Sequence, residues 1–236
     1  MNPTAGVLSE AWGLYKAHWK HLIPIALVVH LALALLGLLL VELGLIGILL
    51  AAMVSIVGYF WVQGALVKTV EDIRDGTADM SMGQTFAAVG PFVPAIAGAS
   101  ILAGFGIVLG FIALIVPGLI LMTLWSVIIP AIVVEGKGAI GSFGRSMQLV
   151  RPHAMSVFGV ILLTLLLGIA FGIVLGLILG FLPEKAEVYI SDVVSGALTA
   201  PFVALTWTIL FFRLRDAQGG TTLPPTGTTG TPGTMG

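Results

Sequence analysis

Residues 114–153 read LIVPGLILMTLWSVIIPAIVVEGKGAIGSFGRSMQLVRPH, and this stretch decides the fold. The run before Glu135 carries no charge and is hydrophobic enough to lie in lipid, whereas Lys137, Arg145 and Arg151 follow soon after it. Because charged side chains are costly inside a bilayer, a boundary between lipid and water falls near Glu135. The rest of the chain shows the same alternation of long uncharged runs and short charged segments.

The composition excludes a water-soluble domain and several classes of chemistry. Of the 236 residues, 58% are hydrophobic and 9% are charged, whereas about 25% of the residues of a soluble domain are charged. The net charge of −1 offers no basic surface for phosphates, so nucleic acid is not an expected partner. The chain contains no Cys, which excludes disulfides, thiolate metal sites and cysteine nucleophiles.

Six uncharged runs are long enough to cross a bilayer, because about 20 helical residues span a hydrocarbon core of roughly 30 Å. The predicted spans are residues 22–41, 45–67, 92–114, 119–134, 154–182 and 193–212. The third and fourth spans come from one charge-free run, in which Pro117-Gly118 is the predicted break. The sequence therefore predicts an all-α polytopic membrane protein. A six-span domain of three hairpins covers residues 1–216, and a disordered Gly/Thr/Pro-rich tail covers residues 217–236.

The positive charges are divided unequally between the two ends of the spans. Of the ten Lys and Arg residues, only Lys185 lies in a turn on the side opposite the others. The positive-inside rule then predicts that both termini lie in the cytoplasm. Residues 3–21, 80–90 and 137–152 carry apolar residues at helical spacing, which predicts amphipathic helices on the inner membrane surface.

The six spans also suggest an internal repeat. Each of the three predicted units has a surface helix, a span, a short outer turn and a returning span. Trp61, Trp125 and Trp207 each lie in the second span of a unit, a few residues before the next inner charge. An aromatic residue at matching depth in every hairpin indicates triplication of one unit.

One group of motifs resembles a known family. The motifs are Val116-Pro117-Gly118, Trp125, Pro130, Val133-Val134-Glu135-Gly136, Arg145-Ser146 and Leu149-Val150. Their order and spacing resemble those of the bacterial membrane domain attached to some glycerophosphoryl diester phosphodiesterases, and of its stand-alone relatives. The ending at residues 211–215 is similar to that family's ending but lacks its usual acidic residue. The resemblance implies a six-span domain of the bacterial cytoplasmic membrane. It does not imply phosphodiesterase activity, which belongs to a separate barrel of about 250 residues.

Arg145 and Arg151 are the candidate lipid-binding residues. Six helical steps place them within roughly 120° of each other, on the side away from an apolar stripe. With that stripe in the acyl boundary, both guanidinium groups would lie at headgroup level, where they could bind phosphate. Two alternatives remain open at this point, namely non-specific anchoring of the helix and an ion pair with Glu135.

Four glycines mark a candidate packing surface. Gly168, Gly172, Gly176 and Gly180 recur every four residues in the fifth span. Small residues at this spacing let a second helix approach closely in a membrane, so we expect a helix contact along this stripe. The partner helix would belong to this chain, to another copy of it or to a different membrane protein.

The sequence predicts no metal site, no cofactor and no catalytic group. The four histidines do not have metal-ligand spacing on one helix face, and His30, in the first span, is interpreted as hydrogen-bonded to a neighbouring helix. The first functional hypothesis is therefore a non-enzymatic scaffold, sensor or regulatory membrane domain. The second is a lipid-handling protein or small-molecule transporter built from three hairpin repeats. Membrane lipids are the expected partners in either case.

Overall fold

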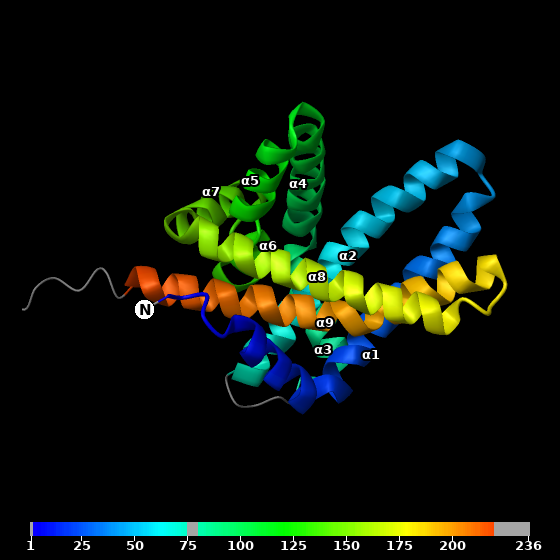
Figure 1. Ribbon diagram of the computed structural model, residues 1–236, viewed down its shortest axis with the longest axis horizontal. Coiled ribbons are helices and arrows are strands. Elements are labelled where there is room, and N and C mark those ends of the chain that lie inside the picture. Colours follow the sequence, from blue (N-terminus) through cyan, green and yellow to red (C-terminus); the bar gives the residue numbers. More distant parts are fainter. Residues whose placement is uncertain (1, 75–79, 220–236) are drawn as a thin grey trace, which may run out of the picture.

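The apolar runs of the sequence fold into helices. The computed structural model describes residues 2–74 and 80–219, which contain no strand (Figure 1). The α-helices are α1 (Val7–Val41), α2 (Gly44–Arg74), α3 (Met82–Val89), α4 (Val93–Ala113), α5 (Ile115–Leu124), α6 (Ile128–Glu135), α7 (Ala139–Val150), α8 (Ala154–Leu179) and α9 (Glu184–Gly219). Six helical stretches are long and apolar enough to cross a membrane. The prediction of an all-α polytopic membrane protein is confirmed.

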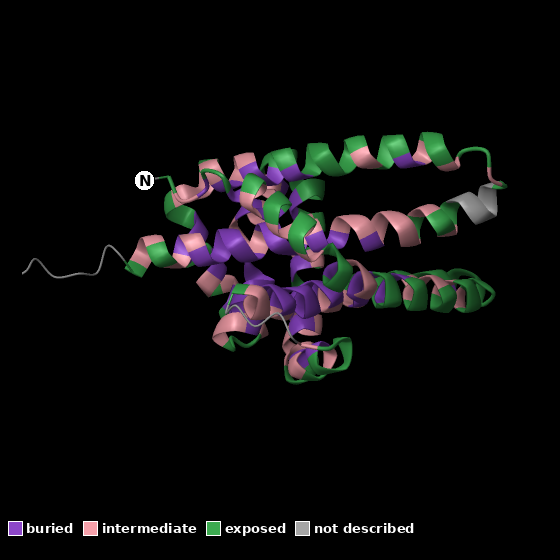
Figure 2. Cartoon of the chain, turned by 90° about the horizontal axis from the view of Figure 1, so that it is seen from below, coloured by how far each residue is buried: buried purple, intermediate pink, exposed green. Residues whose placement is uncertain are grey.

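Three hairpins, α1–α2, α4–α5 and α8–α9, diverge from a common base (Figure 1). Buried residues gather at this base, and the hairpin arms are largely exposed (Figure 2). The side chains near the three tips are strongly exposed: Leu45 is 72% exposed, Leu114 68% and Leu177 80%. Large apolar side chains exposed to this extent are unfavourable in water and harmless in lipid. The base is therefore the packed part of the fold.

Each hairpin is preceded by an amphipathic helix and a bend. The first amphipathic helix is the start of α1, which bends at His18 (φ −121°, ψ 17°), and the third is α7, followed by a bend at His153 (φ −124°, ψ 21°). The second, α3, leads to α4 through a short 3₁₀ turn that ends at Phe92 (φ −90°, ψ −11°). These bends let a surface helix continue into a span of different direction.

The beginning of the chain packs against its last helix. Glu10 and Arg213 form an ion pair of 2.5 Å, and the Tyr15 hydroxyl donates to the Leu198 carbonyl oxygen at 3.1 Å. Trp12 and Tyr15 both meet the ring of Phe202 edge-on. The first and third hairpins are thus joined at the base.

The turn between the third and fourth spans differs from the prediction. The chain reverses at Leu114, which is extended (φ −167°, ψ 152°), three residues before Pro117. Pro117 lies in the first turn of α5, where a missing N–H costs nothing. Gly118 instead allows close packing, because a Cβ added at Gly110 would lie 3.0 Å from the Gly118 Cα. The motif therefore serves the contact between α4 and α5 rather than the turn.

The helices also extend beyond the predicted span limits. α1 includes the predicted surface helix, and α9 continues to Gly219, into the first residues of the predicted tail. The remainder of that tail, residues 220–236, lies outside the described residues.

Candidate functional site

The fourth span is broken in the middle of its apolar sequence. α5 ends at Leu124 and α6 begins at Ile128, with Trp125 (φ −102°, ψ 10°) and Val127 (φ −111°, ψ 25°) outside helical geometry. Pro130 explains the break, since it lacks an N–H for the Ser126 carbonyl and its ring would clash with that carbonyl in a continuous helix. A helix interrupted within a membrane must find other partners for its freed backbone groups.

Ser146 of α7 supplies part of this replacement. Its hydroxyl donates to the Leu124 carbonyl oxygen at 2.7 Å and accepts from the Val127 N–H at 3.3 Å. Ser146 is completely buried, so both bonds are protected from water. The surface helix α7 thereby holds the two halves of the broken span in place.

Ser126 has a buried hydroxyl that no described residue satisfies, and its carbonyl cannot form the usual helical hydrogen bond. The carbonyl lacks the N–H that residue 130 would otherwise donate. A buried polar group left unpaired costs about 1–3 kcal/mol. Native proteins usually avoid this cost, so the break is a position where a bound molecule could add hydrogen bonds.

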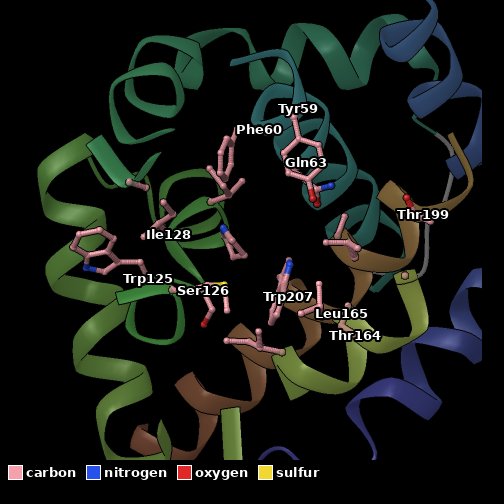
Figure 3. A pocket seen from close by; sticks show the side chains of 18 of the residues that line it. Tyr59, Phe60, Gln63, Trp125, Ser126, Ile128, Thr164, Leu165, Thr199 and Trp207 are labelled. Atoms are coloured by element: carbon pink, nitrogen blue, oxygen red, sulfur yellow. The ribbon is translucent and has the colours of Figure 1, made fainter. Parts of the chain in front are cut away.

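A cavity of about 590 Å³ lies against the break. Its walls come from all three hairpins, namely from α2, α4, the α5–α6 break, α8 and α9 (Figure 3). Trp125, Ser126 and Pro130 all line it. The volume is within the range of small-molecule pockets, about 300–1,000 Å³. The broken span is therefore one wall of a site large enough for a ligand.

Gln63 and Trp207 are the main polar groups inside the cavity. They reach into it from α2 and α9, and the indole nitrogen of Trp207 lies at the end of the ring that faces Gln63 (Figure 3). Gln63 is 4% exposed, and its Nε2 donates weakly to the Ala200 carbonyl oxygen at 3.4 Å. The Gln63 Oε1 is buried without a partner among the described residues. It is thus an unused acceptor inside an apolar cavity.

The two threonines of the cavity wall differ from Gln63. The Thr164 hydroxyl donates to the Val160 carbonyl oxygen at 2.8 Å, and Thr199 donates to Ser195 at 2.7 Å. Each hydroxyl already uses its proton within its own helix. The unpaired polar groups of the cavity are therefore concentrated near Gln63 and the break.

The most exposed side chains of the cavity lining are apolar or aromatic rather than charged. Tyr59 of α2 and Leu165 and Ile169 of α8 line its rim and are 39%, 52% and 50% exposed. Ile128 and Ala204, on the inner wall, are almost completely buried. In a bilayer, an opening bounded by exposed apolar side chains faces lipid, so acyl chains have direct access to the cavity.

Arg145 belongs to a hydrogen-bonded network just beyond the cavity. Its guanidinium donates to both carboxylate oxygens of Glu135, with distances of 2.7–3.0 Å, and to the side-chain oxygens of Gln148 and Gln218 at 3.1 Å. The Gln218 amide in turn donates to the Gln148 carbonyl oxygen at 2.7 Å. The ends of α6, α7 and α9 are thereby tied together.

Arg145 forms an ion pair with Glu135, which was one of the open alternatives to lipid binding. It does not form a joint site with Arg151. Arg151 follows the end of α7 and is exposed. A shared lipid-phosphate site for these two arginines is less favoured by this geometry, because the Arg145 guanidinium is already engaged by a carboxylate and two amides.

The residues of the family motif surround the broken span. Pro117 lies in the first turn of α5 and Gly118 packs on α4. Trp125 and Pro130 flank the break, Glu135 binds Arg145, and Ser146 bridges the two halves. Gly136 ends α6 in a left-handed conformation (φ 65°), which glycine adopts without strain. These spaced residues thus have a common structural role.

The glycine stripe of α8 does not contact another helix of the described chain. A Cβ added at Gly168, Gly172 or Gly176 would meet nothing within 4 Å, and one at Gly180 would meet only the carbonyl oxygen of Gly176. A helix contact within the chain, one form of the prediction, is therefore wrong for the described residues. Contact with a second chain stays a prediction. Gly168 alone has another role, because it lines the cavity.

His30 is buried and hydrogen-bonded within its own helix rather than to a facing one. Its ring Nδ1 lies 2.9 Å from the Ala26 carbonyl oxygen, and the ring packs against Gly196 of α9. The described residues contain no group of three or more His, Asp or Glu side chains placed to hold a metal ion.

Sequence reasoning did not identify Gln63, Ser126 or Trp207 as one site. Each had a local signal: Gln63 is an amide in an uncharged run, Ser126 precedes a proline by four residues, and Trp207 was noted for its depth. Their convergence depends on packing between three hairpins.

Comparisons with protein-family models, with curated proteins and with solved structures found no match to this chain. The fold and the apolar helices define it as a multi-pass integral membrane protein.

Proposed function

We propose that this protein is a non-enzymatic membrane protein that binds a lipid or similar amphiphile in the cavity between its hairpins. The observation that carries this proposal is the broken span, which places unpaired polar groups in an apolar cavity that opens towards lipid. Discontinuous helices form the binding sites of many membrane transporters. Lipid handling is therefore favoured over the purely structural alternatives.

The lining of the cavity supports binding rather than catalysis. It presents an amide, indoles and hydroxyls, with no carboxylate, imidazole or amine among the lining residues that the structure describes. General acid–base and nucleophilic chemistry in enzymes usually require such groups together. The same lining disfavours a carrier of charged solutes, which normally places ionisable groups at the site.

A scaffold or regulatory function retains one supporting observation. A Cβ added at Gly172 or Gly176 of α8 would meet no atom of the described chain within 4 Å, and small residues at this spacing suit a second membrane helix. This function would need a partner protein or a second copy of the chain, whereas the cavity needs only lipid.

A triplicated hairpin is the architecture that we propose for this binding function. Trp61 packs on Phe86 of the following surface helix, with ring centroids 5.6 Å apart, and Trp125 packs on Phe143 in the same way at 4.9 Å. The similar bends at His18 and His153 also support repetition. Three repeated hairpins around one axis would leave a shared central site, as in other repeat-built membrane proteins.

The proposed location is the cytoplasmic membrane of a bacterium, with both termini inside. Because the chain has no Cys, single cysteines report accessibility cleanly. In whole cells, a membrane-impermeant thiol reagent is expected to label Glu42→Cys, in the turn between α1 and α2, and to leave Gly138→Cys unlabelled until the cells are opened. Labelling of Gly138→Cys in intact cells would reverse the orientation.

Filling the cavity is expected to remove a lipid that otherwise co-purifies with the protein. Gly168→Phe suits this purpose, because Gly168 lines the cavity and a Cβ there meets no neighbouring atom. Gly172→Phe is the matched control, since it lies one helical turn further along α8, has equally open surroundings and does not line the cavity.

The measurement is the amount of lipid per protein after extensive washing in detergent, determined by mass spectrometry. The parent and Gly172→Phe are expected to retain the same lipid, and Gly168→Phe to lose most of it. Equal retention in all three proteins would rule out the cavity as the lipid site. If both variants instead change the oligomeric state with unchanged lipid, the scaffold function gains support.

A further inference from the structure

We infer that the cavity selects amphiphiles by charge: its ligand has a single apolar chain and buries an uncharged polar group, such as a hydroxyl or an amide. This inference rests on the proposed function, because it names the class of ligand for the same cavity. It follows from three properties of the site, which are its unpaired groups, its lack of charge and its size.

The polar side chains in the cavity would be satisfied by a ligand that both donates and accepts hydrogen bonds. Gln63 Oε1 is a buried acceptor without a partner among the described residues, and Trp207 brings an indole N–H donor to the same space. The Ser126 hydroxyl can serve in either role. An alcohol or a primary amide matches this set, whereas a hydrocarbon would leave Gln63 unsatisfied.

The absence of charge in the lining excludes an ionised group from the bottom of the cavity. Lys68, which follows the lining residue Val67 in the chain, is paired with Glu71 at 2.6 Å, and Arg145 is paired with Glu135 at 2.7 Å. An ionised group buried in apolar surroundings without a counter-charge is strongly unfavourable. A carboxylate or phosphate would therefore have to stay outside.

The size of the cavity fits one chain. At ~30 Å³ for a water-sized group, a volume of about 590 Å³ accommodates roughly 20 such groups. This number corresponds to one acyl chain with its polar end, and a second chain would remain in the bilayer. Entry past Tyr59 and Ile169 needs no passage through water, because the rim faces lipid.

The test uses two probes with the same chain, dibromostearamide and dibromostearate, at a pH at which the acid is ionised. Bromine quenches tryptophan fluorescence on contact, and Trp125 and Trp207 line the cavity. The full chain is placed in lipid nanodiscs, where the amide is expected to quench the fluorescence saturably. The mole fraction of amide in the lipid that gives half-maximal quenching is expected to be at least about 10-fold lower than that of the carboxylate, and a factor of ten corresponds to 1.4 kcal/mol. Trp207→Phe is expected to remove a large share of this signal, whereas Trp19→Phe, at the protein surface, is not.

Gln63→Leu is expected to raise the half-maximal mole fraction for the amide about 10-fold and to abolish most of the preference over the carboxylate, because the unpaired acceptor is gone. Thr69→Val is the matched control in the same helix as Gln63: its buried hydroxyl donates to the Ala65 carbonyl oxygen and it does not line the cavity, so affinity is expected to stay unchanged. Equal saturable quenching by both probes in the parent would overturn the charge selection and leave lipid binding intact. The absence of saturable quenching by either probe would overturn both this inference and the proposed function.

Discussion

Removing either side of the Glu135–Arg145 ion pair is expected to lower the free energy of unfolding by roughly 2–3 kcal/mol, because the partner is left as a largely buried, uncompensated charge. The carboxylate and guanidinium are 16% and 21% exposed, so this value is below the range for a fully enclosed pair. Arg145→Met also breaks the bonds to Gln148 and Gln218. The measurement is the unfolding midpoint in detergent, followed by the tryptophan signal.

A double variant distinguishes an ion pair from simple loss of packing. Glu135→Leu combined with Arg145→Met leaves no unpaired charge, so it is expected to be more stable than the sum of the two single effects implies. Arg151→Gln is the control on the same surface, where an exposed side chain is expected to change stability by less than ~0.5 kcal/mol. Strictly additive losses, or an equal loss in Arg151→Gln, would contradict the network as a stabilising contact.

For Arg145, the sequence predicts the position in the membrane but not the binding partner. The charge near Glu135 correctly marked the end of the apolar run, because the cost of a charge in lipid does not depend on the tertiary fold. Whether Arg145 met a phosphate or Glu135 was undecidable from spacing. The turn after Gly136 folds α7 back onto α6 and brings the two charges together.

The breaks in the fourth span illustrate a second limit. A proline can be placed in the first turn of a helix or can end the preceding one, and its local sequence is similar in both cases. Pro117, which the sequence predicts as the break, lies in the first turn of α5, whereas Pro130 is the residue that interrupts the span. The distinction depends on Ser146, which stabilises the break from a different helix.

The cavity could not be predicted from the sequence, although the sequence shows that each of its polar residues lies in an uncharged, apolar run. Apolar periodicity identifies which segments cross a membrane but not how hairpins of nearly uniform hydrophobicity pack. Gln63 and Trp207 are far apart in the chain and come together because α2 and α9 meet at the base. In lipid, this packing is decided by close steric fit, which occurs at Gly110 and Gly196 but not along the glycine stripe of α8.

Gly196 provides the sharpest test of that steric fit. It lies where α9 meets α1, and a Cβ added there would be 2.0 Å from the Cδ2 atom of His30. The imidazole has little freedom to move, since it is 7% exposed and its Nδ1 lies 2.9 Å from the Ala26 carbonyl oxygen. Gly196→Ala is therefore expected to force the two helices apart or to displace the ring, at a cost of about 2–3 kcal/mol.

Three further variants identify the cause of this loss. In His30→Ala the space taken by the ring is empty, so adding Gly196→Ala to that background is expected to cost almost nothing, and the two changes together should be less destabilising than the sum of the single effects. Gly104→Ala in α4 is the matched control, because nothing lies within 4 Å of its added Cβ and alanine favours a helix by up to ~1 kcal/mol over glycine. Thermal unfolding in detergent measures all four proteins. A Gly196→Ala variant as stable as Gly104→Ala would mean that α1 and α9 do not approach each other at His30, and this contact between the first and third hairpins would then have to be abandoned.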